Sequence, residues 1–249
     1  MWLLLHGFTG SPQSWSRVVS GAELDRTSLT PTLLGHGLDW QSRAVHSFDS
    51  EVTRLASLAS RDGLPRLLCG YSMGARVALG LLVRQPHLFD AALLIGMHPG
   101  LSDEAARAER RKVDASRAHL LRKNGLEAFV AAWEELPLFA SQRGVSREAL
   151  AEQRSIRLDH DAEGLARSLE VLGLAEMPNY RAVIASIDLP ITLMTGSLDH
   201  KFSEIANALD EESTHVDAEI VGGVGHNVVL EAPAAVAAAM TRVAKQVRG

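Results

Sequence analysis

The sequence contains one cysteine, Cys69, among 249 residues. A single cysteine excludes a disulfide framework and any metal site built from several thiolates. No apolar stretch approaches the roughly 20 residues that a bilayer-spanning helix needs. The first residues also lack the basic leader and the long apolar core of a secretion signal. From these absences we expect a cytoplasmic protein that does not bind membranes.

Positive charge is in short supply as well, because 25 Lys and Arg face 30 Asp and Glu and leave a net charge of −5. That balance argues against general affinity for nucleic acid or for anionic membranes. Repeats and low-complexity tracts are absent, and hydrophobic residues make up 46% of the chain, which is ordinary for a globular protein. The composition is thus that of a globular protein, and a length of 249 residues fits one large α/β domain, with room for an inserted subdomain.

One stretch, residues 70–74, has the form Gly-x-Ser-x-Gly. It follows an apolar run that predicts a buried strand and precedes an Ala/Leu/Val-rich helical pattern. The bare motif arises by chance on the order of once in ten chains of this length, but this strand–motif–helix order is typical of a nucleophile elbow. Ser72 would then lie at a strained turn, between glycines whose Cβ atoms would collide with the neighbouring strand or helix.

Two further residues complete a possible catalytic triad. Asp199 follows a predicted strand over 187–196, and His226 follows another over 218–221. In a parallel sheet these loops gather at one edge. His226 could accept the Ser72 proton while Asp199 orients and stabilises the imidazole. Asp199 could instead merely end a strand, and His226 could cap the last helix, but the order nucleophile, acid, base favours the triad.

The loop over 6–10, after a predicted strand at 2–5, could supply half of an oxyanion hole. In hydrolases with this layout, an early His-Gly loop provides one backbone N–H and the residue after the nucleophile provides the other. We assign these donors to Phe8 and Met73, although the loop could also be an ordinary strand–helix connection. His36, which lies between two glycines, we interpret as structural.

The pattern changes between residues 97 and 180, where strand signals vanish and charges become dense. Helical patterns there cover 102–123, 125–136, 146–158 and 162–172. On either side, strands predicted at 2–5, 27–34, 66–69, 91–96, 187–196 and 218–221 alternate with helices, which predicts a mostly parallel sheet covered on both faces. We therefore predict a core over 1–96 and 181–249 with a helical cap, 97–180, inserted after a central strand.

Over its whole length the sequence resembles the α/β-hydrolase superfamily. Within it, the chain is similar to the menaquinone-pathway synthases called MenH, which are 2-succinyl-6-hydroxy-2,4-cyclohexadiene-1-carboxylate synthases. The resemblance rests most specifically on cap motifs, which are His98-Pro99-Gly100-Leu101, Arg107-Ala108-Glu109-Arg110, Trp133, Pro137-Leu138-Phe139-Ala140-Ser141 and Arg154. It extends through the elbow, Asp199-His200-Lys201-Phe202 and 225–227. It implies a lyase reaction, in which the Ser-His-Asp triad removes a proton and pyruvate is eliminated, without a metal or organic cofactor.

The resemblance also implies a small-molecule substrate with three carboxylates, and arginines match carboxylates in paired hydrogen bonds. It assigns substrate binding to Arg76, Arg110 and Arg154. Tyr71 and Trp133 would wall the pocket, and Lys201 would add positive charge. We take four other cap arginines to be solvated surface residues: Arg107, Arg111, Arg117 and Arg122. The assembly expected is a monomer or a small homo-oligomer.

Two alternatives stay open. The chain could be a carboxylesterase, thioesterase or C–C bond hydrolase with the same triad, or a non-catalytic hydrolase-like binding protein. The sequence also departs from the superfamily pattern: relatives carry an antiparallel hairpin before the strand ending at His6, whereas here Met1 falls almost at that strand. We expect the sheet to lack those edge strands, unless the start is assigned late.

Overall fold

The computed structural model describes residues 1–21, 28–42, 46–60 and 66–247. Six strands in these residues form one sheet in the order β2-β1-β3-β4-β5-β6, and every neighbouring pair is parallel. The strands are β1 (Trp2–Leu5), β2 (Ser28–Leu29), β3 (Leu67–Tyr71), β4 (Ala91–Ile95), β5 (Ile191–Gly196) and β6 (Val216–Val221). The predicted strand over 27–34 is thus shorter than expected: β2 has two residues, Thr27 lies outside the described residues, and 30–34 form a loop.

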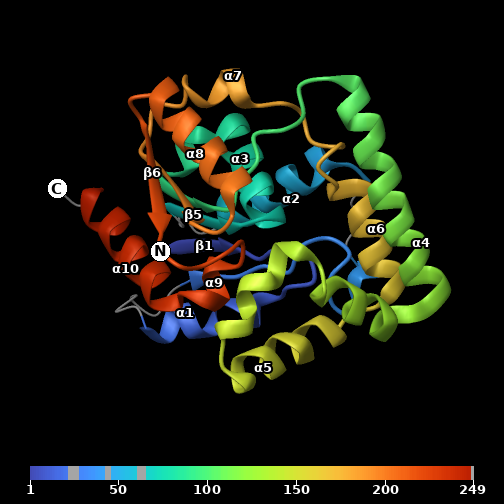
Figure 1. The fold of residues 1–249 in the computed structure, drawn as a ribbon. Helices are drawn as coiled ribbons and strands as arrows, with labels where there is room; N and C mark the ends of the chain where they lie inside the picture. The colour runs from blue at the N-terminus through green and yellow to red at the C-terminus, as the bar shows by residue number, and fades with distance from the viewer. Residues whose placement is uncertain (22–27, 43–45, 61–65, 248–249) are drawn as a thin grey trace.

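Helices cover both faces of this sheet (Figure 1). One face carries α1 (Ser16–Gly21) and α10 (Pro233–Gln246), and the other carries α2 (Phe48–Ser60), α3 (Met73–Arg84) and α8 (His200–Glu212). Successive side chains of a strand point to opposite faces. Accordingly Trp2 and Leu4 join the apolar cluster under α1 and α10, whereas Leu3 and Leu5 join the cluster under α2 and α3. Burial on both faces explains why the strands are apolar throughout.

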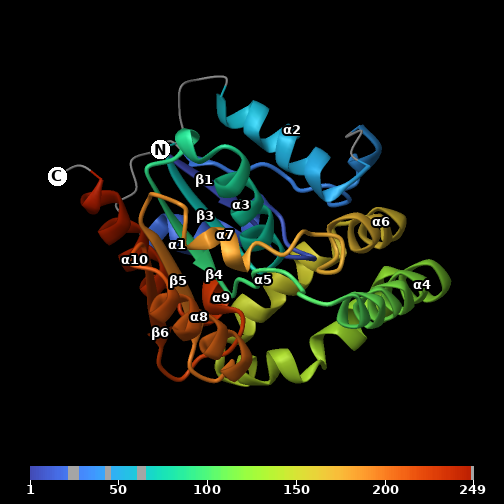
Figure 2. The same ribbon diagram turned by 90° about the horizontal axis from the view of Figure 1, so that it is seen from above.

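The segment between β4 and β5 is helical and stands beside the sheet as a cap (Figure 2). It contains α4 (Glu104–Glu134), the 3-10 helix η4 (Pro137–Gly144), α5 (Arg147–Leu158) and α6 (Ala162–Leu172). Gly125 interrupts α4 with φ 82° and ψ 173°, which confirms the break expected between the first two cap helices. Helices α4 and α6 share an apolar core of their own, with Leu121, Phe129 and Leu165 fully buried. The exact limits of the cap, 97 and 180, stay a prediction.

The remaining elements are short: η1 (Pro12–Trp15), η2 (Trp40–Ser42), η3 (Pro86–Leu88), α7 (Arg181–Ile184) and α9 (Val228–Glu231). Within the described ranges, no helix combines the length and apolarity needed to cross a membrane. Nor do three His, Cys, Asp or Glu side chains come together there in a way that could hold a metal ion.

Candidate active site

Ser72 lies at the sharp turn between β3 and α3. Its backbone has φ 53° and ψ −108°, a conformation strained for any residue with a Cβ. The turn depends on its glycines. A Cβ on Gly74 would lie 2.2 Å from the Leu5 carbonyl oxygen, and one on Gly70 would lie 2.5 Å from the Gly74 oxygen. Both contacts are with backbone that cannot move aside, so the structure accounts for the Gly-x-Ser-x-Gly pattern as sterically required.

The three residues of the predicted triad come together at the carboxyl ends of three strands. His226 Nε2 lies 2.9 Å from Ser72 Oγ, and His226 Nδ1 lies 2.6 Å from Asp199 Oδ2. Asp199 directly precedes α8, and His226 lies in the loop between β6 and α9. Both side chains are buried, so the imidazole and the carboxylate interact with little solvent screening. The arrangement allows a proton to pass from Ser72 Oγ to His226 while Asp199 stabilises the imidazolium.

Aromatic rings and one glycine fix the orientation of the His226 ring. Phe202 lies 4.7 Å and Tyr71 5.6 Å from it, centroid to centroid. Gly96, at the end of β4, has φ +57°, and a Cβ there would lie 2.9 Å from the imidazole. Only glycine therefore allows the ring to lie so close to the strand end. Phe202 and Gly96 were not identified as site residues from the sequence, because their role depends on strands that neighbour each other only in the fold.

The predicted oxyanion donors belong to the residue after Ser72 and to the loop that follows β1. Met73 is the first residue of α3, and the first amides of a helix have no acceptor within the helix. Phe8 lies in the loop after β1, which runs beside β3. Both residues line the same cavity as Ser72. Two N–H groups in these positions could stabilise negative charge on a substrate oxygen.

That cavity has a volume of about 380 Å³, is open to solvent, and lies between the sheet edge and the cap. Four cationic residues line it: Arg76, Arg110, Arg117 and Lys201. No aspartate or glutamate belongs to the described part of its lining. The apolar part of the cavity wall includes three aromatic side chains, those of Tyr71, Trp133 and Phe139. A cavity with this distribution of charge favours a ligand with several negative charges.

Arg76, one turn into α3, is almost fully buried at 7% exposure. Its Nη1 donates a 2.7 Å hydrogen bond to the Leu172 carbonyl oxygen, which orients the guanidinium. Burial, together with the nearby charge of Arg110, lowers the pKa of Arg76 to about 9. In the described part of the chain no carboxylate forms an ion pair with Arg76, and the charge of Asp114 offsets the lowering of its pKa only in part. Burying a cation without such a partner is unfavourable, and an anionic ligand would relieve that cost.

Arg110 and Arg117 belong to one face of α4 and share a buried carboxylate. Arg110 Nε donates to Asp114 Oδ2 at 2.7 Å, and Arg117 Nη1 lies 3.4 Å from Asp114 Oδ1. The Arg117 guanidinium also lies over the Trp133 ring, 5.1 Å from the centroid. Assigning Arg117 to the solvated surface was therefore wrong. Arg110, Asp114 and Arg117 stand at i, i+4 and i+7, and this spacing could have placed Arg117 on the same helix face as Arg110.

The other three arginines taken as surface residues have structural contacts. Arg111 pairs with Glu104 and Glu176, and Arg122 pairs with Glu163 and Glu170 across α4 and α6. Arg107 donates to the carbonyl oxygens of Ala175 and Met177 where the chain leaves the cap. None of the three is among the residues that line the active-site cavity.

Arg154 is not brought together with the other predicted binding residues. Its guanidinium pairs with Glu134, is 43% exposed, and lines a neighbouring groove between α5 and η4. Arg157, one turn further along α5, is the buried member of this group at 4% exposure. It binds Glu134 at 3.0 Å and lies over the Phe139 ring. The sequence did not single out Arg157 as the inward-facing arginine of α5. Arg154 and Arg157 are three residues apart on this helix, and that spacing alone does not say which of them faces inward.

His98 also lines the cavity and was not assigned to the site from the sequence. Burial, reinforced by the positive charges of Lys201 and Arg76, lowers the pKa of His98 to about 4. The imidazole is therefore neutral near pH 7, and its Nδ1 accepts a hydrogen bond from the Gly100 N–H at 3.1 Å. Lys201 is exposed at the cavity entrance, with Nζ 5.8 Å from the Phe202 ring.

Comparison with known proteins places this geometry in a family. Residues 2–239 match the model of the alpha/beta hydrolase family. The chain is 36% identical to 2-succinyl-6-hydroxy-2,4-cyclohexadiene-1-carboxylate synthase of Enterobacter sp. (strain 638), covering 97% of this chain and 91% of the relative. It is 35% identical to the protein of the same name from Klebsiella pneumoniae (strain 342), covering 97% and 93%.

Comparison with solved structures leads to the same family. MenH from S. aureus superimposes with a TM-score of 0.92 at 29% identity, covering all of this chain and 94% of that one. A thermophilic esterase from Thermogutta terrifontis superimposes with a TM-score of 0.82 at 23% identity, covering 100% and 90%, which shows a common fold alone. The chain is thus a member of the alpha/beta hydrolase family and, within it, of the 2-succinyl-6-hydroxy-2,4-cyclohexadiene-1-carboxylate synthase (MenH) family of enzymes.

Proposed function

We propose that this enzyme is a lyase that eliminates pyruvate from 2-succinyl-5-enolpyruvyl-6-hydroxy-3-cyclohexene-1-carboxylate to give 2-succinyl-6-hydroxy-2,4-cyclohexadiene-1-carboxylate, a step of menaquinone biosynthesis. The product is the one in the relatives' names. The observation that carries the proposal is the cavity lined by Ser72 and His226, whose partner Asp199 does not belong to the lining. Four cations line this cavity and, among its described residues, no carboxylate does. A substrate with three carboxylates matches that lining.

In the first step, Ser72 acts as a relay base. His226 Nε2 takes the hydroxyl proton, and Ser72 Oγ removes the proton from the carbon next to the succinyl ketone. Asp199 holds the imidazole by its Nδ1 and stabilises the imidazolium that forms. Ser72 forms no covalent bond to the substrate in this step, because the reaction needs a proton removed and no acyl group transferred.

The electron pair left on carbon moves into the ketone, and the resulting enolate oxygen is held by the Phe8 and Met73 amides. Electrons then return through the ring, form the second ring double bond and break the C–O bond to the enolpyruvyl group. That group leaves as the enolate of pyruvate and takes up one proton to become pyruvate. His226 supplies this proton, which it took from Ser72 in the first step.

Substrate binding is assigned to the cationic lining. Arg76 is oriented by Leu172, while Arg110 and Arg117 are oriented by Asp114, so each guanidinium is held in place before the ligand arrives. Pre-organised guanidinium groups lose less entropy for each carboxylate hydrogen bond that they form. Tyr71 and Trp133 would pack against the ring, and Lys201 would draw the ligand toward the entrance. Arg154 stays a proposed ligand residue, although it lies on Glu134 outside this cavity.

The test compares two substrates on the purified enzyme. Pyruvate release from the enolpyruvyl substrate is followed by coupling to lactate dehydrogenase and NADH, and p-nitrophenyl acetate hydrolysis is followed by absorbance. We expect kcat/KM for the enolpyruvyl substrate to exceed that for the ester by several orders of magnitude. Ser72→Ala should abolish pyruvate release. Fast ester turnover without pyruvate release would refute the lyase proposal in favour of a carboxylesterase or thioesterase.

A further inference from the structure

Thr9, which follows Phe8 in the loop over 6–10 (the oxyanion loop), has a strained backbone. Its φ is +61°, and Thr9 and Ser72 are the two non-glycine residues with positive φ in the described part of the chain. A β-branched residue in this region is a genuine outlier, and such a conformation persists only where the surroundings hold it in place. The Phe8 amide proposed as an oxyanion donor belongs to the residue directly before this strained one.

Two histidines from distant parts of the chain hold the Thr9 backbone. The Thr9 N–H donates to His36 Nε2 at 3.2 Å, and the Thr9 carbonyl oxygen lies 3.2 Å from His160 Nε2. His36 lies in the loop after β2, and His160 lies in the cap, between α5 and α6. Both imidazoles are buried, and their ring centroids are 5.3 Å apart. Both backbone hydrogen-bonding groups of Thr9 are thus satisfied by histidine side chains, while its hydroxyl donates to the Phe8 carbonyl oxygen at 2.6 Å.

The contacts fix which nitrogen of each ring carries the proton. His36 Nε2 accepts from Thr9, so its proton is on Nδ1, which faces the Leu34 carbonyl oxygen at 2.9 Å. His160 Nδ1 accepts from the Gly37 N–H at 2.8 Å, so its Nε2 carries the proton that is donated to Thr9. The arrangement works only with neutral rings, since a second proton would set N–H against N–H. Burial lowers the pKa of both histidines and so favours that state.

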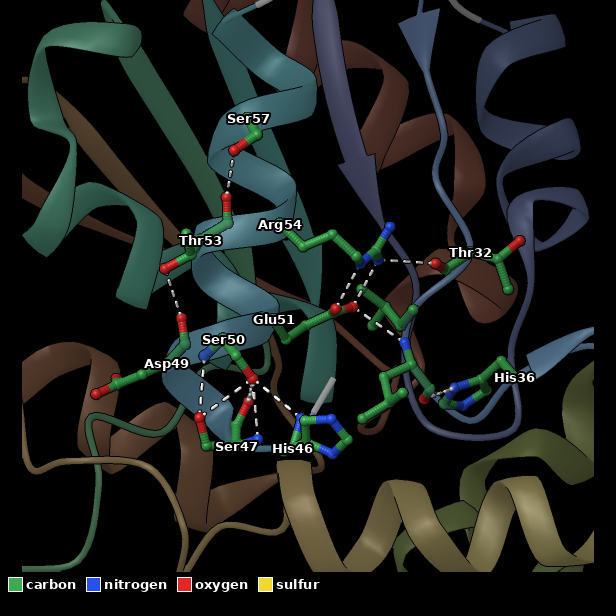
Figure 3. Close-up of polar contacts among 12 residues, drawn as sticks. Thr32, His36, His46, Ser47, Asp49, Ser50, Glu51, Thr53, Arg54 and Ser57 are labelled. Atoms are coloured by element: carbon green, nitrogen blue, oxygen red, sulfur yellow. Dashed lines mark hydrogen bonds and ion pairs between the residues drawn. The ribbon is translucent and has the colours of Figure 1, made fainter. Parts of the chain in front are cut away.

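The loop that carries His36 is itself held on two sides. From α2, Glu51 Oε1 accepts from the Leu34 N–H, and Arg54 bridges Glu51 to the Thr32 carbonyl oxygen (Figure 3). From the cap, α6 approaches so closely that a Cβ on Gly35 would lie 2.2 Å from the Gly164 oxygen. His36 therefore connects a rigid support to the oxyanion loop.

The cap side of the connection is equally well defined. Asp161, the residue after His160, caps α6 and accepts from Trp40 Nε1 at 2.9 Å. Charged groups near this connection include the Glu51–Arg54 pair on α2, which holds the Leu34 amide, and Asp159 and Asp161 beside His160. A third buried imidazole, His6, lies 4.8 Å from His36, centroid to centroid. His6 Nε2 accepts from the Leu33 N–H, which joins the loop carrying His36 to the first residue of the oxyanion loop.

We propose that His36 and His160 are positioning residues that hold the Phe8 oxyanion donor in place through the strained backbone of Thr9. His160 thereby makes the seated cap a part of the oxyanion hole, because a cap that moved away would release the Thr9 carbonyl. The inference rests on the proposed function in that the Phe8 amide serves as a donor. It predicts that loss of the His160 contact impairs the chemical step more than substrate binding, because the cationic residues that bind the substrate stay in place.

The test uses His160→Phe, which keeps a buried ring but removes both hydrogen bonds, and His160→Gln, whose amide can accept from Gly37 and donate to Thr9. We expect His160→Phe to lower kcat for pyruvate release by about 10- to 100-fold, the effect of a small misplacement of a catalytic group, with KM changed less than threefold. His160→Gln should recover most of that loss. His119→Phe, at an exposed position of α4, is the matched control and should leave kcat unchanged.

A second substitution tests the strain directly. Glycine adopts positive φ without penalty, so Thr9→Gly should restore most of the kcat lost in His160→Phe when the two are combined. The proposal is overturned if His160→Phe lowers only the melting temperature and keeps the wild-type kcat, or if Thr9→Gly gives no recovery. p-Nitrophenyl acetate hydrolysis uses the same oxyanion donors. If the enzyme released no pyruvate, the same pattern among the variants on the ester would support the positioning role while the lyase proposal failed.

Discussion

Replacement of Arg117 by methionine is the sharpest test of the cationic cavity. Methionine keeps an unbranched apolar stem over the Trp133 ring and removes only the charge and its donors. Asp114 remains paired with Arg110 at 2.7 Å, so the change does not leave a buried carboxylate alone. The expected result is a higher KM for the enolpyruvyl substrate, with kcat nearly unchanged, because Arg117 is assigned to binding and not to proton transfer.

The size of the effect follows from the surroundings of Arg117. Two unit charges 4 Å apart near a protein surface attract by about 4 kcal/mol. Arg117 is 28% exposed and already lies 3.4 Å from Asp114, and both facts reduce its net attraction for a ligand. We therefore expect a loss of about 1–2 kcal/mol, which is roughly a five- to thirtyfold decrease in kcat/KM. Arg117→Lys keeps the charge without the planar fork, so its kcat/KM should lie between those of the wild type and Arg117→Met.

Arg111→Met on the same helix is the matched control, because Arg111 pairs with Glu104 and Glu176 away from the cavity. Steady-state pyruvate release is measured for both variants, with p-nitrophenyl acetate as a neutral substrate. The same kcat/KM, within twofold, for Arg117→Met and Arg111→Met would mean that Arg117 does not bind the substrate. An equal loss of activity on the neutral ester and on the tricarboxylate would mean that Arg117 supports the fold instead.

Three further outcomes are expected. Gly74→Ala should prevent folding or abolish the elbow, because its Cβ would lie 2.2 Å from the Leu5 oxygen; circular dichroism and soluble yield measure this, and a folded, fully active variant would contradict it. The pKa values of His36 and His160 lie below 6.5, so the unfolded chain binds more protons than the folded one, and the free energy of unfolding should fall as pH drops below about 6.5. Urea titrations at several pH values measure this dependence, and the slope of unfolding free energy against pH should be shallower for His160→Gln. An unchanged slope would argue against the neutral-histidine network. Arg154→Ala should reduce kcat/KM less than Arg117→Met, since Arg154 lies on Glu134 outside the cavity; a larger loss in the same coupled assay would mean that Arg154 reaches the substrate.

The predictable features of this molecule were those with local or steric causes. The elbow was predictable because Gly70 and Gly74 are required by backbone contacts only a few residues away or on the neighbouring strand. The meeting of Ser72, Asp199 and His226 followed from parallel strands, which gather their carboxyl ends at one edge. Even the break in α4 at Gly125 was visible as an interruption between two helical patterns.

What escaped prediction depends on how distant segments pack. The direction of a long side chain on an amphipathic helix is set by the surface that the helix meets, so Arg117 faces the cavity while Arg154 faces Glu134. His36 does have the structural contacts expected of it, but its link to His160 joins residues 124 positions apart, and no local pattern in the sequence marks it. The strand predicted over 27–34 proved short because most of that segment forms the loop carrying His36.

The proposed function depends on the triad removing a proton and expelling pyruvate without hydrolysing an acyl bond. The most direct measurement is a proton NMR time course of the enzyme with the enolpyruvyl substrate. Pyruvate and the cyclohexadiene product should appear in equal amounts, at a rate that Ser72→Ala abolishes while the folded structure is retained. Unchanged substrate in the presence of an enzyme that turns over esters, or pyruvate release that persists in Ser72→Ala, would contradict it.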